Sequence, residues 1–519
     1  MDPIALSIFV SRIEAVCDEM GAVLKRAAFS PNIKDRLDYS CAVFDVDGEL
    51  CAQAAHIPVH LGSMAYAMRD IVARLAWQAG DMVVMNDPYL GGTHLPDVTL
   101  IAPVFVADEH VGFVANRAHH ADIGAATPGS MPISRCLEEE GMIIPPTYLY
   151  RNGKPVHPVL DEMVASTQNP RDSRGDFAAQ ISANLAGVAR LVELVAALGC
   201  AHYLNGLVQL NDYAERLARA SLADIPDGQY RFQDVMDDDG QGTRDIPIQV
   251  SITVCTGDIH VDFKGTAAQV AGNINCPLSV AAAGVFYVFR CLMPEQTPAC
   301  AGSFRPIRLS APEGCLLNAH RPAAVAAGNV ETSTRVVDVV MGALAQAIPQ
   351  RIPAASHGSM NNLAMGASGE VGSWSYYETI GGGMGAGELG GGLDGLQTHM
   401  TNTLNTPVES LEMHYPLRVQ RYAIRRGSGG SGQRSGGDGI VREYLFLQPT
   451  VVTLLTERRL HRPWGSDGGE AGEAGRNLLN AQAIAPKQTM RLEPGDVLCI
   501  ETPGGGGWGK AESDLLQGM

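Results

Sequence analysis

The sequence predicts an α+β fold divided into several domains. At 519 residues the chain is long enough for two to four domains with ample cores. Segments with the period-two alternation of strands follow segments with helical periodicity without a regular strand–helix–strand rhythm, which favours α+β over α/β. The 58 glycines gather in the last third of the chain and indicate many tight turns. We find no internal repeat.

The first segment, residues 1–203, is predicted to begin with an amphipathic helix over residues 4–28. Its apolar side chains form one stripe, and charged residues such as Arg12 and Lys25 interrupt the apolar run, so it is not a signal peptide. Strands at 40–45 and 49–53 are joined by an Asp-Gly turn and predict a hairpin. The other expected elements are a helix at 62–78, a strand at 81–85, and helices at 176–198 and 203–223.

Two further domains are predicted from changes in pattern. Residues 204–351 form a middle α+β domain, and residues 352–519 form a glycine-rich, β-rich C-terminal domain. The middle domain is expected to have strands at 228–232, 246–254 and 259–263 and alanine-rich helices at 279–293 and 332–348. The C-terminal domain is expected to have strands at 443–447, 450–455 and 496–502.

Composition excludes several classes of protein. A net charge of −18 argues against nucleic acid or an anionic membrane as a partner. No stretch is expected to approach a membrane span, and we expect a cytoplasmic protein. The eleven cysteines include no Cys-x-x-Cys pair, which favours reduced, buried thiols over a structural zinc site held by thiolates.

Two short clusters of polar residues carry the main chemical signal. Residues 86–97 read Asn-Asp-Pro-Tyr-Leu-Gly-Gly-Thr-His-Leu-Pro-Asp, and residues 117–122 read Arg-Ala-His-His-Ala-Asp. The residues between them read as strand, turn and strand, so a hairpin is expected to carry both clusters to one end of a sheet. His94, Asp97 and His119 would face each other there. Such a mixed nitrogen and oxygen set suits a divalent cation that keeps one position open for water.

Several longer motifs extend this signal along the chain. They lie at residues 32–42, 56–64, 86–97, 117–122, 175–184, 262–266, 272–275, 398–409, 428–439 and 503–509. On these motifs, in this order, the chain resembles the hydantoinase B/oxoprolinase family over essentially its whole length. That family contains the B-type subunits of ATP-dependent N-methylhydantoinase, 5-oxoprolinase and caprolactamase, and the α-type subunits of acetone and acetophenone carboxylases.

The resemblance implies a set of metal ligands. A His-x-x-Asp pair and a second histidine 25 positions after the first correspond to His94, Asp97 and His119. An upstream acidic residue completes the set and matches Asp35 best, where relatives usually carry glutamate, with Asp38 as the second choice. Zn, Mn, Fe and Mg all remain open as the single divalent ion.

Neighbouring polar residues have weaker claims to the site. His120 is adjacent to a ligand on a strand and so is expected on the opposite face, in a supporting or structural position. Asp122 either orients an imidazole, acts as a base or caps a turn. We therefore take His120 and Asp122 as the catalytic candidates. One of His56 and His60 is a candidate to line the pocket, and Asp87 is expected to fix its loop.

The function implied by the resemblance is ring opening of a cyclic amide such as a hydantoin, 5-oxoproline or a lactam. A separate A-type ATPase subunit would bind ATP and phosphorylate the substrate, and this chain would supply metal-activated water, in an A2B2-type hetero-oligomer. The near P-loop at residues 504–511 has Ala511 where a magnesium-binding hydroxyl is required, which argues against ATP binding there. The alternatives are a ketone carboxylase subunit that uses ATP and bicarbonate, and a scaffold without catalytic activity that stabilises an ATPase.

Overall fold

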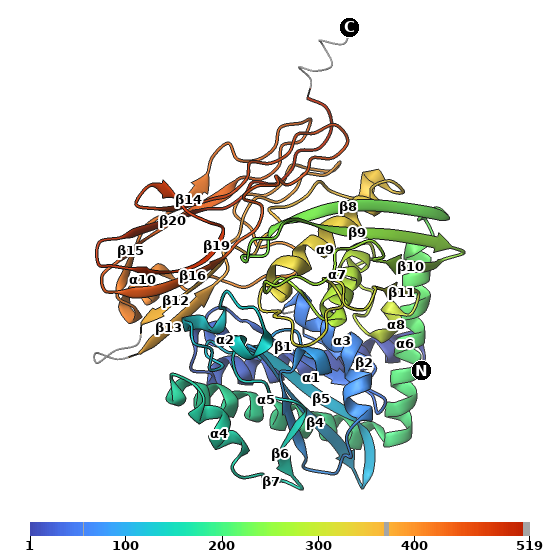
Figure 1. The fold of residues 1–519 in the computed structure, drawn as a ribbon. Coiled ribbons are helices and arrows are strands. Elements are labelled where there is room, and N and C mark those ends of the chain that lie inside the picture. Colours follow the sequence, from blue (N-terminus) through green and yellow to red (C-terminus); the bar gives the residue numbers. More distant parts are fainter. Residues whose placement is uncertain (55–56, 368–372, 512–519) are drawn as a thin grey trace.

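The computed structural model describes residues 1–54, 57–367 and 373–511. Helices and four sheets of named strands are mixed along the chain, which confirms the α+β class (Figure 1). The sheet built from the N-terminal part lies at the bottom of the view, and the sheets built from the last third lie at the upper left. His56, a candidate from the sequence, lies outside the described residues.

The N-terminal sheet has seven strands in the order β2-β1-β5-β4-β3-β6-β7, and all neighbouring strands are antiparallel. Its strands are β1 (Tyr39–Phe44), β2 (Leu50–Gln53), β3 (Met82–Met85), β4 (Asp97–Val106), β5 (Glu109–His119), β6 (Thr147–Arg151) and β7 (Lys154–Pro155). The long central pair β4–β5 is the hairpin that the sequence predicts between the two polar clusters.

Helices cover both faces of this sheet because successive strand residues point to opposite sides. One face packs on α1 (Pro3–Ala27) and α5 (Pro170–Leu198), and α6 (Cys200–Leu222) extends the same core. The other face packs on α3 (Pro58–Ala73). The short helices α2 (Pro31–Lys34) and α4 (Val159–Ala165) lie near the ends of the layer.

The middle part packs on the outer side of α3. Helix α7 (Leu278–Cys291) contacts α3 so closely that a Cβ on Gly62 would lie 2.6 Å from the Cα of Ala283. Helix α9 (Ser333–Leu344) then joins α7 to a four-stranded sheet in the order β11-β10-β9-β8. The strands are β8 (Gly228–Asp238), β9 (Arg244–Cys255), β10 (Asp258–Asp262) and β11 (Ile307–Ser310), and α8 (Ala301–Phe304) precedes β11.

The C-terminal part contains two more sheets, in the orders β13-β12-β16-β19 and β14-β15-β20-β17-β18. Their strands are β12 (Asn362–Ala367), β13 (Trp374–Glu378), β14 (Leu417–Arg425), β15 (Gly439–Phe446), β16 (Thr450–Leu455), β17 (Arg476–Leu479), β18 (Gln482–Ala483), β19 (Lys487–Leu492) and β20 (Val497–Glu501). Helix α10 (Val408–His414) precedes β14.

The glycine-rich segments of this part pack backbone against backbone. Gly505 donates its N–H to the carbonyl of Gly437 and accepts from the N–H of Gly430, each at 2.9 Å. A Cβ on Gly505 would lie 2.1 Å from the carbonyl oxygen of Met384, so only glycine fits there. Residues 504–509 are buried in this packing, which is not the exposed loop that a phosphate-binding motif requires.

Two expectations from the sequence need correction. The helix expected at 62–78 runs from Pro58 to Ala73, because Pro58 provides a first turn that the apolar periodicity does not mark. Helix α5 is long and apolar enough, by length and composition alone, to meet the criterion for a membrane span, so the expectation that no stretch approaches one is wrong. Gln180 of α5 donates to the carbonyl of Val98 on β4, as a core helix of this layer would.

Two other expectations concern the domain boundaries and the cysteines. The predicted domain boundary at residue 203 falls inside α6, and the division into domains stays a prediction. All eleven cysteines lie among the described residues and are free thiols, but Cys255 and Cys291 are exposed, so the expectation of burial is wrong for these two.

Candidate metal centre

The register of the β4–β5 hairpin places Asp97 opposite His119. Asp97 is the first residue of β4, His119 is the last residue of β5, and the two form a cross-strand pair. Both belong to the set of alternate residues that point toward α3 rather than α5. A pairing of this kind brings two side chains together without any contribution from loops.

His94 reaches the same point from the turn that precedes β4. The carbonyl of His94 accepts a hydrogen bond from the N–H of Asp97 at 3.1 Å, which closes the turn. His94 and Asp97 are fully buried, and His119 is 3 % exposed. The sequence predicts that these three side chains face each other, and they lie together in the structure.

The three side chains converge as the ligands of a cation would. Their ligand atoms all lie within 4.8 Å of one another. Two ligand atoms that each lie about 2.2 Å from one ion are separated by about 4.4 Å at most, so the observed spacing is close to that of a bound ion. His94 Nε2 lies 3.1 Å from Asp97 Oδ1, and His119 Nδ1 lies 3.3 Å from the same oxygen. His94 Nε2, Asp97 Oδ1 and His119 Nε2 are buried and have no hydrogen-bond partner among the described residues. Unpaired buried donors and acceptors are costly, and a bound cation would satisfy them.

Neighbouring groups fix the orientation of each ligand. The imidazole of His94 faces the carbonyl of Ala326 through Nδ1 at 3.1 Å, which leaves Nε2 as the atom that faces Asp97. Asp97 Oδ2 accepts from the Thr93 hydroxyl at 2.6 Å and from the Asn329 amide at 3.0 Å, so that Oδ1 is left for the ion.

The ring of His119 is held by an aromatic partner. It stacks on Tyr377 with 4.7 Å between ring centroids and 8° between planes. Tyr377 belongs to β13, and Asn329 belongs to the π-helical turn η4 (Gly328–Thr332). The middle and C-terminal parts of the chain thus complete a centre that the N-terminal sheet begins. Asn329 and Tyr377 are not predicted as site residues from the sequence, because nothing in their local pattern points to the hairpin.

Charge and burial act in opposite directions on the ligands. Burial alone would raise the pKa of Asp97, but the His60 and His94 rings beside it hold that pKa well below the ordinary range. Burial disfavours protonation of His94, yet the charge of Asp97 raises the pKa of His94. Burial lowers the pKa of His119. The shifts of Asp97 and His119 thus favour the carboxylate and the neutral imidazole, which are the forms that bind metal, whereas the shift of His94 favours its protonated form while the cation is absent.

The upstream acidic residues are placed unequally. Asp35 is partly exposed at the C-terminal end of α2 and is not among the residues whose ligand atoms converge. Asp38 is buried and lies nearer, with Oδ1 at 4.0 Å from His60 Nε2. Neither carboxylate belongs to the converging group, and a ligand role for Asp35 or Asp38 stays a prediction.

His60 also lies at the centre, on the first turn of α3. Its Nε2 is 3.2 Å from Asp97 Oδ1, and its Nδ1 is 3.5 Å from the hydroxyl of Ser40. Together with Asp38 and His119 it lines a cavity of about 20 Å³, which is room for about one water molecule.

The two catalytic candidates from the sequence have structural partners. His120 points to the α5 side of the sheet, where Nε2 is 2.8 Å from Gln180 Oε1. Asp122 accepts hydrogen bonds from the backbone N–H groups of Gly124, Gln168 and Asn169 at 2.5–2.9 Å. The structure brings neither side chain into the converging group, and a catalytic role for them stays a prediction. Asp87 caps its own loop by accepting from the N–H of Tyr89, as expected.

The fold and the convergent residues define a class of protein: a multi-layered α+β chain with a buried cluster of two histidines and a carboxylate at the end of a hairpin. Residues 2–511 match the family described as Hydantoinase B/oxoprolinase, and the chain belongs to that family.

Among solved structures, the chain is similar to the ATP-dependent caprolactamase of Pseudomonas jessenii, with a TM-score of 0.92 and 26 % identity, covering 100 % of this chain and 93 % of that one. It also shares its fold with an acetone carboxylase, with a TM-score of 0.88 and 18 % identity, covering 100 % of this chain and 77 % of that one.

Among curated proteins, an uncharacterised protein of Methanocaldococcus jannaschii is 39 % identical over 98 % of this chain and 91 % of its own length. The 5-oxoprolinase 1 of Arabidopsis thaliana is also 39 % identical over 98 % of this chain, but the match spans only 42 % of its length. The chain therefore covers less than half of the oxoprolinases that it resembles. The family includes ATP-dependent enzymes that act on cyclic amides.

Proposed function

We propose that this chain is the B-type component of an ATP-dependent cyclic-amide hydrolase that opens a hydantoin, 5-oxoproline or lactam ring. The observation that carries the proposal is the convergence of His94, Asp97 and His119, where the buried His94 Nε2 and Asp97 Oδ1 have no hydrogen-bond partner among the described residues and a cation would satisfy both. The similarity to a caprolactamase and to 5-oxoprolinases supports the choice of substrate class.

The trio would hold one divalent cation, and its nitrogen and oxygen donors suit Zn, Mn, Fe or Mg. When bound, such an ion supplies a Lewis acid that activates water at neutral pH and stabilises negative charge on oxygen. The protein contributes preorganised ligands. Ala326 holds His94 in place, and Thr93 and Asn329 hold Asp97. These side chains would therefore lose little conformational freedom when a cation binds.

His60 is the residue that we assign to proton transfer. It lines the cavity beside the trio and presents Nε2 toward Asp97 and Asp38. From there Nε2 can take a proton from the attacking water and return it to the ring nitrogen as the amide bond breaks. We prefer His60 to His120 and Asp122 because His120 Nε2 and both carboxylate oxygens of Asp122 already have protein partners.

We place ATP on a partner. An amide is a poor electrophile, and phosphorylation of its oxygen would make its carbon open to attack by water. Breakage of the C–N bond would then leave an acyl phosphate, and a second water would hydrolyse it to the carboxylate and inorganic phosphate. The glycine-rich segment at residues 504–509 is packed inside the protein and offers no phosphate loop. The longer 5-oxoprolinases contain more than twice the length matched here, which is consistent with an ATPase in the remainder. We therefore expect a separate A-type subunit, in an A2B2-type assembly.

The test is reconstitution of this chain with its A-type subunit, with ring opening and ADP release measured on a panel of cyclic amides. His94→Ala should abolish ring opening and remove the metal while thermal unfolding stays cooperative. His110→Ala is the matched control, because His110 lies on the same hairpin at the opposite end, against Phe105. Full turnover by His94→Ala would refute the proposal. Turnover that depends on bicarbonate and a ketone would indicate the carboxylase alternative.

A further inference from the structure

Arg117 lies behind the pair of residues that begins the candidate metal centre. It is on β5, two residues before His119, and it pairs across the hairpin with Thr99 as His119 pairs with Asp97. Alternate residues of a strand share a face, so Arg117 and Thr99 are on the same side of the sheet as the two candidate ligands, toward α3. The side chain of Arg117 is fully buried there.

The guanidinium of Arg117 contacts three different segments. Its Nε donates to the hydroxyl of Thr99 at 2.8 Å, its Nη1 donates to Ser63 Oγ at 2.7 Å, and its Nη2 donates to the carbonyl of Gly91 at 3.3 Å. Thr99 is on β4, Ser63 is on α3, and Gly91 is on the loop that leads into β4. Because a guanidinium is planar and rigid, these bonds fix the positions of the three segments relative to one another.

The same segments carry the residues of the centre. Arg117 and its partners each lie two or three positions from one of those residues: Arg117 from His119, Thr99 from Asp97, Gly91 from His94 and Ser63 from His60. The hydroxyl of Ser63 also contacts the carbonyl of His60 at 3.0 Å, so the guanidinium is linked to the turn of α3 that carries this histidine. One side chain therefore contacts or carries all four N-terminal segments that supply the centre.

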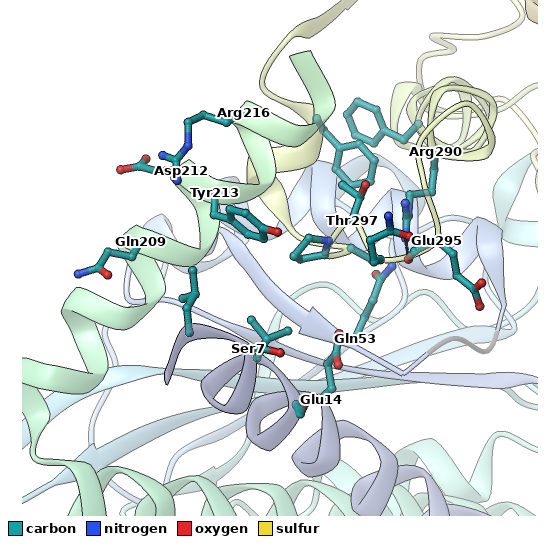
Figure 2. Close-up of a pocket in the computed structure, with 18 of the residues that line it drawn as sticks. Ser7, Glu14, Gln53, Gln209, Asp212, Tyr213, Arg216, Arg290, Glu295 and Thr297 are labelled. Atoms are coloured by element: carbon teal, nitrogen blue, oxygen red, sulfur yellow. Dashed lines mark hydrogen bonds between the residues drawn. The ribbon is translucent and has the colours of Figure 1, made fainter. Parts of the chain in front are cut away.

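The charge of Arg117 has no close counter-ion. Its hydrogen-bond partners are uncharged, and no carboxylate in the described part of the chain forms an ion pair with it. Arg216 is different: Figure 2 shows it on α6 beside Asp212, at a cavity of about 940 Å³ between α1, α6 and α7. Burial lowers the pKa of Arg117 to about 10, and the charge of Asp97 opposes that shift, so the guanidinium stays protonated at neutral pH. Since burial of a cation is costly, each of its three hydrogen bonds is needed.

We propose that Arg117 is the positioning residue of the metal centre. With Thr99, Ser63 and Gly91 it forms a clamp, the Arg117 clamp, which joins β5, β4, α3 and the loop before β4 and sets the relative positions of the candidate ligands and of His60 before any metal binds. The inference rests on the proposed function for the group that the centre holds, whereas the clamp itself is formed by the metal-free chain.

The first test removes one contact of the clamp and keeps its charge. Thr99→Val deletes the hydroxyl that accepts from Nε, and Ser63→Ala deletes the acceptor of Nη1. Competition against a fluorescent chelator should show metal binding about 10-fold weaker in each variant, and Thr99→Ser should restore it. Thr453→Val is the matched control, since Thr453 is a buried strand threonine that bonds Thr489 in the C-terminal part. The control should lose stability without losing metal affinity, and wild-type affinity in both Thr99→Val and Ser63→Ala would overturn the clamp.

The second test needs no metal. Hydrogen exchange of the metal-free chain, followed by mass spectrometry, should be about 10-fold faster in Thr99→Val than in wild type at two segments that do not contain residue 99, namely the loop at residues 88–96 and the first two turns of α3. Exchange that is unchanged, or faster in β4 alone, would overturn the clamp, because the lost bond would then act only locally. Faster exchange at both segments in a chain whose wild type never holds metal would contradict the proposed function and leave the clamp standing.

Discussion

Replacing Asn329 by alanine removes the amide that holds Asp97 from the middle part of the chain. The side chain is 2 % exposed and donates to Asp97 Oδ2 at 3.0 Å, and a hydrogen bond to a charged acceptor contributes about 1.5–3 kcal/mol. The Thr93 hydroxyl at 2.6 Å remains on the same oxygen. Loss of a residue that supports a metal ligand weakens metal binding about 10- to 100-fold. Because the Thr93 contact remains, we expect Asn329→Ala to weaken metal binding about 10-fold, which is about 1.4 kcal/mol.

The assay is competition for the metal against a fluorescent chelator at fixed pH, with thermal unfolding measured on the same samples. Asn477→Ala is the matched control, since Asn477 is an equally buried amide that bonds Thr456 and Arg459 in the C-terminal part. The control should lose stability without losing metal affinity. If Asn329→Ala holds metal as tightly as wild type, Asp97 is not positioned from the middle part and the reasoning fails.

Three further changes have defined outcomes. Burial and the charge of Glu457 raise the pKa of Glu331 from 4.5 to about 8. Between these values the folded chain keeps a proton that the unfolded chain loses, so stability should fall as pH rises from about 4.5 to 8, and less steeply in Glu331→Gln by urea unfolding. Gly505→Ala forces a Cβ to 2.1 Å from a backbone oxygen and should cost about 3 kcal/mol in the same assay, and an unchanged midpoint would contradict this packing. Tyr377→Phe keeps the ring that stacks on His119 and should hold metal normally, whereas Tyr377→Ala should weaken it about 10-fold; equal affinities would show that the stacking is unimportant.

The sequence predicts those parts of the site that depend on local register. Asp97 and His119 meet because a hairpin with a short turn fixes which residues pair, and His94 is added by the turn immediately before the strand. The same alternation places His120 on the opposite face of the sheet.

The remainder of the site depends on contacts between distant segments. Asn329 lies 232 positions from Asp97, and neither it nor Tyr377 stands in a pattern that indicates where its side chain points. His60 was one of two histidine candidates, and only the early start of α3 at Pro58 shows that it reaches Asp97. The sequence leaves Asp122 open as a base because its partners include backbone amides 46 and 47 positions away, which no local pattern indicates.

One measurement tests the central claim most directly: elemental analysis of the purified chain, before and after metal loading, in wild type and in His94→Ala. We expect one equivalent of a divalent metal in the wild type and less than a tenth of that in the variant, with both proteins folded by circular dichroism. Wild-type protein that takes up no metal under any loading condition, or His94→Ala protein that retains a full equivalent, would contradict the account.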